Sequence, residues 1–181
     1  TLGTQAAIAI ENARIFERMQ QGYKEVNALY RITKGLTVSL DTGKLMKDVV
    51  ELLQENFGYY LAQIYIIDPL TDDLGQPHAA PVLPKASGEI GKRMLRDNWR
   101  LQAGSGIIGH AAEIGTPFFT NNVEEVIFYV RNPYLPDAHA ELAIPIIVYG
   151  HELGVLDVQQ TPPLHLTEHD LQLVSAVAEQ L

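Results

Sequence analysis

The sequence predicts an α+β domain with a central, mainly antiparallel β-sheet of five or six strands, helices packed on that sheet, and a long helix before it. Residues 141–148 and 153–159 are two apolar runs rich in β-branched side chains and separated by a short turn, which is the pattern of a β-hairpin. Because both runs are apolar at nearly every position, we expect this hairpin to be covered on both faces, at the centre of the sheet. The N-terminal residues instead show helical periodicity.

Two local details of the hairpin follow from residue type. Glycine at the first central position suits a type II′ turn, so the turn is predicted at Gly150 and His151. Pro145 lies within the first strand and has no N–H to donate to the ladder, so we expect a β-bulge there.

Residues 1–37 are predicted to form a linker helix. Apolar or small residues recur there in alternating steps of four and three, which is the 3.5-residue period of a coiled-coil seam. The alternative is an amphipathic helix that packs on its own domain. We expect a homodimer contact, which the C-terminal helix would extend. The predicted seam contains Ile8, Asn12, Ile15, Met19, Val26 and Leu29.

The remaining elements are predicted in chain order. A helix begins after a cap at Ser39 or Asp41 and ends at Gly58. Thr167 caps the last helix. Between them we expect strands at 60–67 and 81–86, a helix at 88–97, a short strand at 99–101, a helix at 106–113, a strand at 118–120 and an irregular segment at 121–138.

Composition excludes several classes of function. The formal net charge is −9, which disfavours nucleic-acid and anionic-membrane partners because both require clustered Lys and Arg. The sequence contains no cysteine, and this removes disulfides, thiolate metal sites and thiol catalysis. We therefore expect a cytoplasmic domain that contacts neither nucleic acid nor membrane.

The sequence contains few motifs that could bind a cofactor or a metal, or catalyse a reaction. Residues 104–109 satisfy G-x-G-x-x-G, but Gly115 and Pro117 end the following helix early and no parallel strand with a terminal acid follows, so a dinucleotide site is not expected. The helix N-terminus at Gly106 could still present amide N–H groups to a small anion. The histidines are scattered, so no metal site is predicted, and haem on His110 or His139 is a distant alternative. No nucleophile stands beside a base, so we predict no catalytic residue and no enzyme.

Several segments, taken in order, resemble a GAF domain of bacterial multi-domain sensor kinases. They are Asn56-Phe-Gly-Tyr-Tyr, Gln63-Ile-Tyr-Ile-Ile-Asp, Leu101-x-x-Gly-x-Gly-Ile-Ile-Gly-His, Asn132-Pro-x-Leu-Pro, Ala140-Glu-Leu-Ala-Ile-Pro-Ile and Gly154-Val-Leu-Asp-Val-Gln. The resemblance covers about residues 25–181. It implies a domain at 38–181 that ends in the start of a linker helix, while residues 1–37 look like the exit helix of a preceding GAF domain in a tandem array.

The resemblance also implies a function. Bilin-carrying and methionine-sulfoxide-reducing members use cysteine, which is missing here, and the Asn-Lys, Phe, Asp-Glu pattern of cyclic-nucleotide binders is absent, so no cofactor is predicted. What remains is a cavity between the sheet and the 100–140 crossover that could take an unknown small molecule. Its candidate lining is Trp99, Ile108, Phe119, Phe128, Tyr129, Tyr134 and Leu142. We expect a sensor or relay module beside GAF or histidine-kinase domains of a two-component system; the alternative is a ligand-free dimerisation spacer.

Overall fold

In the computed structural model the described residues are 41–71, 77–102 and 104–181, together with single helical residues between Ala6 and Gly22. Of the predicted dimer seam, Ile15 is helical and 44% exposed. The other seam positions, Ile8, Asn12, Met19, Val26 and Leu29, lie outside the described residues. Within the described ranges no helix combines the length and apolar character that crossing a bilayer requires.

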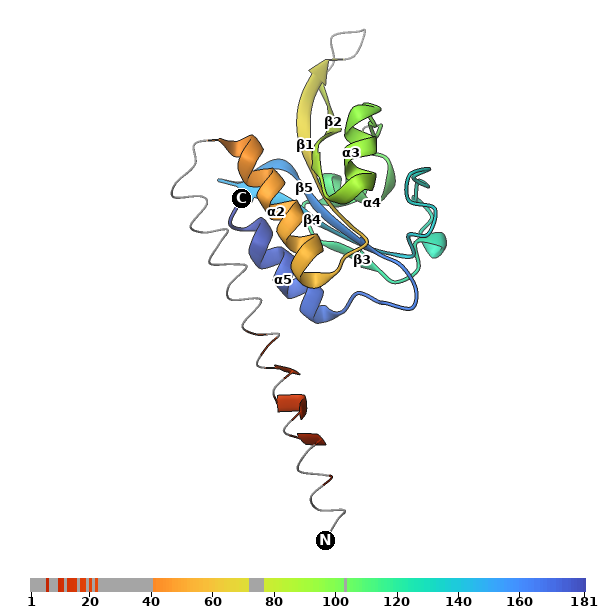
Figure 1. Ribbon diagram of the computed structural model, residues 1–181. Helices are drawn as coiled ribbons and strands as arrows, with labels where there is room; N and C mark the ends of the chain where they lie inside the picture. The colour runs from red at the N-terminus through yellow and green to blue at the C-terminus, as the bar shows by residue number, and fades with distance from the viewer. Residues whose placement is uncertain are drawn as a thin grey trace.

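The described elements form one five-stranded antiparallel sheet with helices on both faces, as predicted (Figure 1). In chain order they are α2 (Thr42–Phe57), β1 (Leu61–Thr71), β2 (Pro77–Ala86), α3 (Gly88–Arg96), α4 (Gly106–Ile114), β3 (Phe118–Thr120), the 3-10 helix η1 (Val123–Glu125), β4 (Ala140–Val148), β5 (His151–Gln160) and α5 (Glu168–Ala178). The strand order is β2-β1-β5-β4-β3, so the predicted hairpin of β4 and β5 does lie at the centre, beside β1.

Local signals locate the helix ends correctly. The Asp41 side chain accepts a hydrogen bond from the Lys44 N–H at 3.1 Å, and Gly58 ends α2 in the left-handed conformation at φ 72°. Thr167 caps α5 in a reciprocal capping box with Asp170. Each of these ends is specified by residues within one turn of it.

The hairpin turn differs from the prediction. Val148 pairs with His151, so the two-residue loop is Tyr149 and Gly150. Both have positive φ, 51° and 78°, which makes the turn type I′ rather than type II′. Tyr149 therefore occupies the first central position of the turn, and it is 97% exposed.

The predicted bulge at Pro145 is also displaced. Pro145 pairs in register with Val155, and the register shifts between Ile146 and Ile147 instead. The paired part of β3 ends opposite Ala143. At Pro145, β4 is thus a sheet edge among the described strands, where a missing N–H costs no ladder hydrogen bond.

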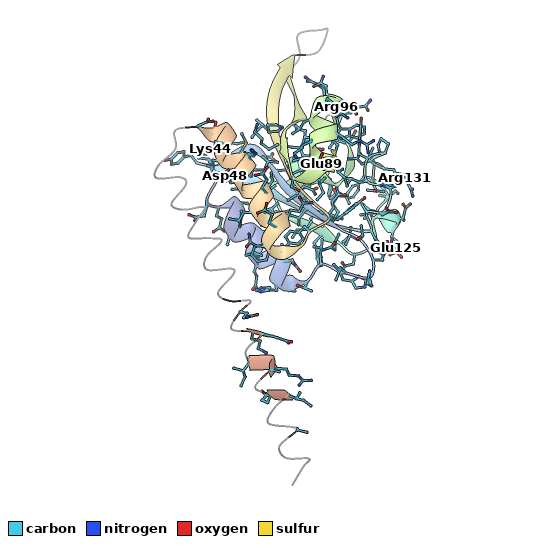
Figure 2. All side chains as sticks on the ribbon, in the orientation of Figure 1. Lys44, Asp48, Glu89, Arg96, Glu125 and Arg131 are labelled. Carbon is cyan, nitrogen blue, oxygen red and sulfur yellow. The ribbon has the colours of Figure 1, made fainter. Side chains whose placement is uncertain are left out.

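Side chains alternate between two cores. We call the side covered by α2 and α5 the α2/α5 face, and the side covered by α3, α4 and the segment 121–138 the α3/α4 face (Figure 1). Leu142, Leu156 and Val158 point to the α2/α5 face, whereas Ala143 and Val155 point to the α3/α4 face. Labelled charged side chains such as Lys44 and Glu89 project outward from the helices (Figure 2).

Candidate functional site

Polar side chains interrupt the apolar α3/α4 face of the three central strands. Gln63 on β1, Glu141 on β4, and Asp157 and Gln159 on β5 are at most 4% exposed. Strand register aligns them, because Gln63 pairs with Asp157, and Glu141 pairs with Gln159. We call these four residues the buried polar cluster.

Asp157 is the hydrogen-bond acceptor at the centre of this cluster. Its Oδ2 accepts hydrogen bonds from Gln63 Nε2 at 2.7 Å and from Gln159 Nε2 at 3.2 Å. The Tyr65 hydroxyl reaches Gln63 Oε1 at 3.4 Å. Asp157 Oδ1 is fully enclosed and accepts no hydrogen bond from any described N–H or hydroxyl group. One oxygen of the carboxyl therefore accepts two amide hydrogen bonds, and the other has no such donor among the described residues.

Burial raises the pKa values of both carboxyl groups of the cluster. Burial raises the pKa of Glu141 well above its ordinary value, and the neighbouring Asp157 raises it further. Burial also raises the pKa of Asp157, to about 7, although the amides of Gln63 and Gln159 and a hydrogen bond from Glu141 counteract this rise. Both shifts favour the protonated forms of these acids, and a hydrogen bond between two carboxyl groups requires a proton on one of them.

Three members of the cluster, Gln63, Glu141 and Gln159, border a cavity of about 20 Å³. A space of this size is enough for about one water molecule. The first turn of α4 and the segment 121–138 form its other walls. Its lining residues are Gln63, Tyr65, Leu101, Gly106, Ile107, Ile108, Tyr129, Val130, Asn132, Glu141 and Gln159.

The glycines before and within α4 allow close packing. Gly106 has φ 72°, and a Cβ on Gly109 would lie 2.6 Å from the carbonyl carbon of Gly104. The G-x-G-x-x-G spacing thus folds the chain tightly against the helix. Ser105 occupies the N-cap position, but its side chain makes no capping hydrogen bond. The first-turn N–H groups of α4 have no intrahelical acceptor, and Gly106, Ile107 and Ile108 border the cavity.

Five of the predicted pocket residues lie on the α3/α4 face. Ile108 and Tyr129 line the cavity itself. Trp99 and Tyr134 pack edge-to-face with ring centroids 5.6 Å apart, and the Tyr134 hydroxyl donates to Asp97. Phe128 packs against the rings of His110 and Phe118, at 4.1 and 5.2 Å between centroids.

The other two predicted pocket residues do not join them. Phe119 and Leu142 belong to the core of the α2/α5 face. Strand alternation is the reason, because the neighbours of these residues, Phe118 and Glu141, occupy the opposite face. The sequence signal for the buried polar cluster was present but not recognised: Glu141, Asp157 and Gln159 are polar residues inside runs otherwise apolar on both faces.

Other parts of the described structure offer fewer polar groups that could bind a ligand. A groove of about 380 Å³ on the α2/α5 face is larger, but no charged or amide side chain converges on it. It is lined by Thr42, Leu45, Met46, Ile64, Ile66, Ile67, Ile146, Leu153 and Leu181. Across the described ranges, no three His, Asp or Glu side chains come together as metal ligands.

Comparison with known proteins identifies the class. The family model described as "GAF domain" matches residues 41–181. The chain belongs to the GAF domain family, a regulatory and sensor fold of signal-transduction proteins. No curated protein sequence matches this chain.

Solved structures agree on the fold. The GAF domain of a phosphoenolpyruvate-protein phosphotransferase from Coxiella burnetii is 26% identical, with a TM-score of 0.70 over 87% of this chain and 89% of that one. A free methionine-R-sulfoxide reductase from Neisseria meningitidis, solved in complex with its substrate, is 19% identical, with a TM-score of 0.69 over 86% of this chain and 84% of that one. The nlh2 GAF domain of A. aeolicus in an inactive state is 20% identical, with a TM-score of 0.68 over 88% and 94%.

The raised pKa values of Glu141 and Asp157 predict a pH dependence of stability. Above pH about 5 the unfolded chain has released protons that folded Glu141 and Asp157 retain, so the folded state binds more protons and its stability falls as pH rises. Each retained proton contributes a slope of about 1.4 kcal/mol per pH unit. Urea unfolding between pH about 5 and 8 should show this decline.

Glu141→Gln imitates the protonated acid and should make that decline shallower. Glu113→Gln is a matched change at an exposed position of α4, and its stability should fall with pH at the same slope as in the original protein. Equal slopes in all three proteins would contradict the raised pKa of Glu141 in the folded state.

Proposed function

We propose that this chain is a non-enzymatic sensor or relay module of a cytoplasmic signal-transduction protein, which binds a small molecule in the cavity under the segment 121–138. The observation that carries this proposal is the convergence of buried ionisable and amide groups on that cavity. Burying two carboxyl groups is costly unless they are paired and hydrogen-bonded, and an apolar core needs neither. Their position beside a closable space favours binding over a purely structural role.

The segment 121–138 has the construction of a lid. Val123 and Leu135 are buried at its two ends, and Val123 N–H donates to the His139 carbonyl at 2.9 Å. Between these anchors Ile127 is 99% exposed, while Tyr129 and Val130 reach down to the cavity. Short turns rather than a sheet ladder hold the middle of the segment, which supports opening between fixed ends.

The proposal excludes catalysis on chemical grounds. Some proteins of this fold are enzymes, among them the free methionine-R-sulfoxide reductases. The present sequence contains no cysteine, so it offers no thiol for such a reduction. Its similarity to those enzymes would then extend to a binding cavity and not to their chemistry.

The alternative is a ligand-free dimerisation spacer. The observation that favours it is the cavity itself, whose volume of about 20 Å³ is too small for a metabolite while the segment 121–138 stays closed. In that case the aromatic side chains of the segment would only complete the core of the α3/α4 face.

A relay also needs a dimer contact, which we propose for the helix of residues 1–37. Ile15→Asp combined with Val26→Asp would bury charges in the apolar seam and should give a monomer that keeps its sheet. Light scattering at high micromolar concentration, with circular dichroism for folding, measures both properties. Ala13→Asp combined with Gln20→Asp adds the same charge outside the seam and should remain dimeric. A monomeric original protein would rule out this contact.

Hydrogen exchange tests the lid. Amides in 121–138 should exchange faster than those of β4 and β5 in free protein, and should slow when a small-molecule extract of the host cells is added. Tyr129→Ala removes a cavity wall and should abolish the slowing, whereas Ile127→Ala changes only the outer surface and should preserve it. Protection of 121–138 equal to that of the central hairpin in free protein would favour the spacer.

A further inference from the structure

We propose that the start of α5 controls how firmly the segment 121–138 is anchored, through a clamp between the Asn121 side chain and the backbone of Leu166. The inference rests on the proposed function, because the part that it regulates is the lid of the cavity. It comes from hydrogen bonds that join both ends of the segment to the loop before α5. We call that loop, residues 161–166, the α5 entry loop.

Asn121 begins the segment, directly after β3, and its side-chain amide bonds to one residue of the entry loop. Its Oδ1 accepts a hydrogen bond from the Leu166 N–H at 2.8 Å, and its Nδ2 donates to the Leu166 carbonyl at 2.9 Å. Leu166 belongs to neither a helix nor a strand and is only 3% exposed. Loss of the Asn121 amide would therefore leave an N–H and a carbonyl of a buried residue without these partners, which is costly.

The far end of the segment is bonded to the start of the same loop. The His139 N–H donates to the Gln160 carbonyl at 2.9 Å. The buried Gln160 side chain accepts a hydrogen bond from the Thr161 N–H at 3.0 Å and donates to the Gly58 carbonyl, at the end of α2, at 3.2 Å. The two ends of the segment thus hold the two ends of the entry loop.

The entry loop leads directly into the cap of α5. Thr167 follows Leu166 and forms the capping box with Asp170. Asp170 Oδ1 also accepts a hydrogen bond from the buried Tyr59 hydroxyl at 2.7 Å, next to the end of α2. The helix α2 ends and α5 begins at the same end of the domain (Figure 1). The cap of α5 and the clamp therefore share one short stretch of backbone.

Coupling follows from this shared stretch. If the first turn of α5 frays, Leu166 moves with Thr167, and Asn121 loses its two hydrogen bonds. The anchor at Val123, which follows closely in the chain, then opens more readily. Because coupling free energies are reciprocal, a firmly held segment also stabilises the start of α5. Strain applied to α5 would thus change how tightly the lid is held at its ends, while the strands of the sheet stay paired.

Amide hydrogen exchange, measured by NMR on the full chain without any ligand, tests the clamp. Thr167→Ala removes the capping box and should accelerate exchange of the Leu166 and Leu171 amides by about five-fold. The Val123 amide should accelerate by about two-fold or more, because Asn121 transmits the change. In the original protein Val123 should exchange faster than the amides of β4 and β5, so that its rate reports local opening rather than global unfolding.

Asn121→Ala removes the clamp. The Leu166 amide should then exchange about ten-fold faster, and adding Thr167→Ala should no longer change the Val123 rate. A merely structural role of Asn121 would not abolish this response. Asn121→Asp keeps the size and the acceptor for the Leu166 N–H but removes the donor. It should weaken the response in the same direction, and it replaces Asn121→Ala if circular dichroism shows that variant unfolded.

Two control variants match these changes. Asp41→Ala removes the cap of α2, at the opposite end of that helix from Gly58, and should leave the Val123 rate unchanged. Asn122→Ala removes a side chain that donates to Glu125 on the surface, and the response of Val123 to Thr167→Ala should persist in that background.

Four results would overturn the inference. They are an unchanged Val123 rate in Thr167→Ala, an equal response after Asn121→Ala, an equal response to Asp41→Ala, and exchange of Val123 as slow as that of the central hairpin. The host extract tests ligand binding separately. An unresponsive Val123 amide together with slowing of 121–138 by the extract would therefore reject the clamp and leave the sensor function standing.

Discussion

The pairing of the buried carboxyl groups of Glu141 and Asp157 is the interaction on which the site depends, because these acids lie in the central strands of a sheet that is covered on both faces. An ionised carboxylate there would need several donors, and Asp157 finds only two amide groups, from Gln63 and Gln159. The second acid supplies the missing donor while it stays protonated. Hydrogen bonds and a retained proton thus allow a polar cluster to lie inside a covered sheet.

The apolar core between α2 and α5 and the buried polar cluster lie on opposite faces of the sheet. The α2/α5 face holds an apolar core between two capped helices and the sheet, and no buried acid among the described residues belongs to it. The α3/α4 face holds the buried polar cluster, the start of α4 and the segment 121–138. Both faces share the strands β1, β4 and β5, so a change at the cluster can reach the terminal helices through a sheet one layer thick. This is the route by which we propose that pocket occupancy alters helix contacts.

Local chemistry made much of the fold predictable from sequence. Asp41, Gly58 and Thr167 act within one turn of themselves, and the two apolar runs around the hairpin identify the central strands. The predicted turn was one residue too late, because Gly150 was expected at the first central position of a type II′ turn. In the structure Gly150 occupies the second central position of a type I′ turn. The bulge was misplaced because the edge beside Pro145 is set by the length of β3.

The candidate site was less predictable because it depends on pairing between distant strands. Ile108 and Tyr129 were predicted by analogy with the cavity of GAF domains, but Leu142 was assigned to the wrong side of the sheet, since face assignment requires the register of β4. The cluster itself joins residues 94 positions apart, Gln63 and Asp157, which no local pattern brings together. The sequence signal that could have identified the cluster is the presence of the polar residues Glu141, Asp157 and Gln159 in two runs that are otherwise apolar.

Carbon-13 NMR of the side-chain carboxyl groups, titrated from acid to alkaline pH, tests the central claim most directly. Assignment of Glu141 and Asp157 uses Glu141→Gln and Asp157→Asn. The account predicts that Glu141 keeps its proton at neutral pH and that the titrations of the two carboxyl groups depend on each other, so that Glu141→Gln changes the Asp157 curve. Two independent titrations at the ordinary values of exposed carboxyl groups, near pH about 4, would contradict the account.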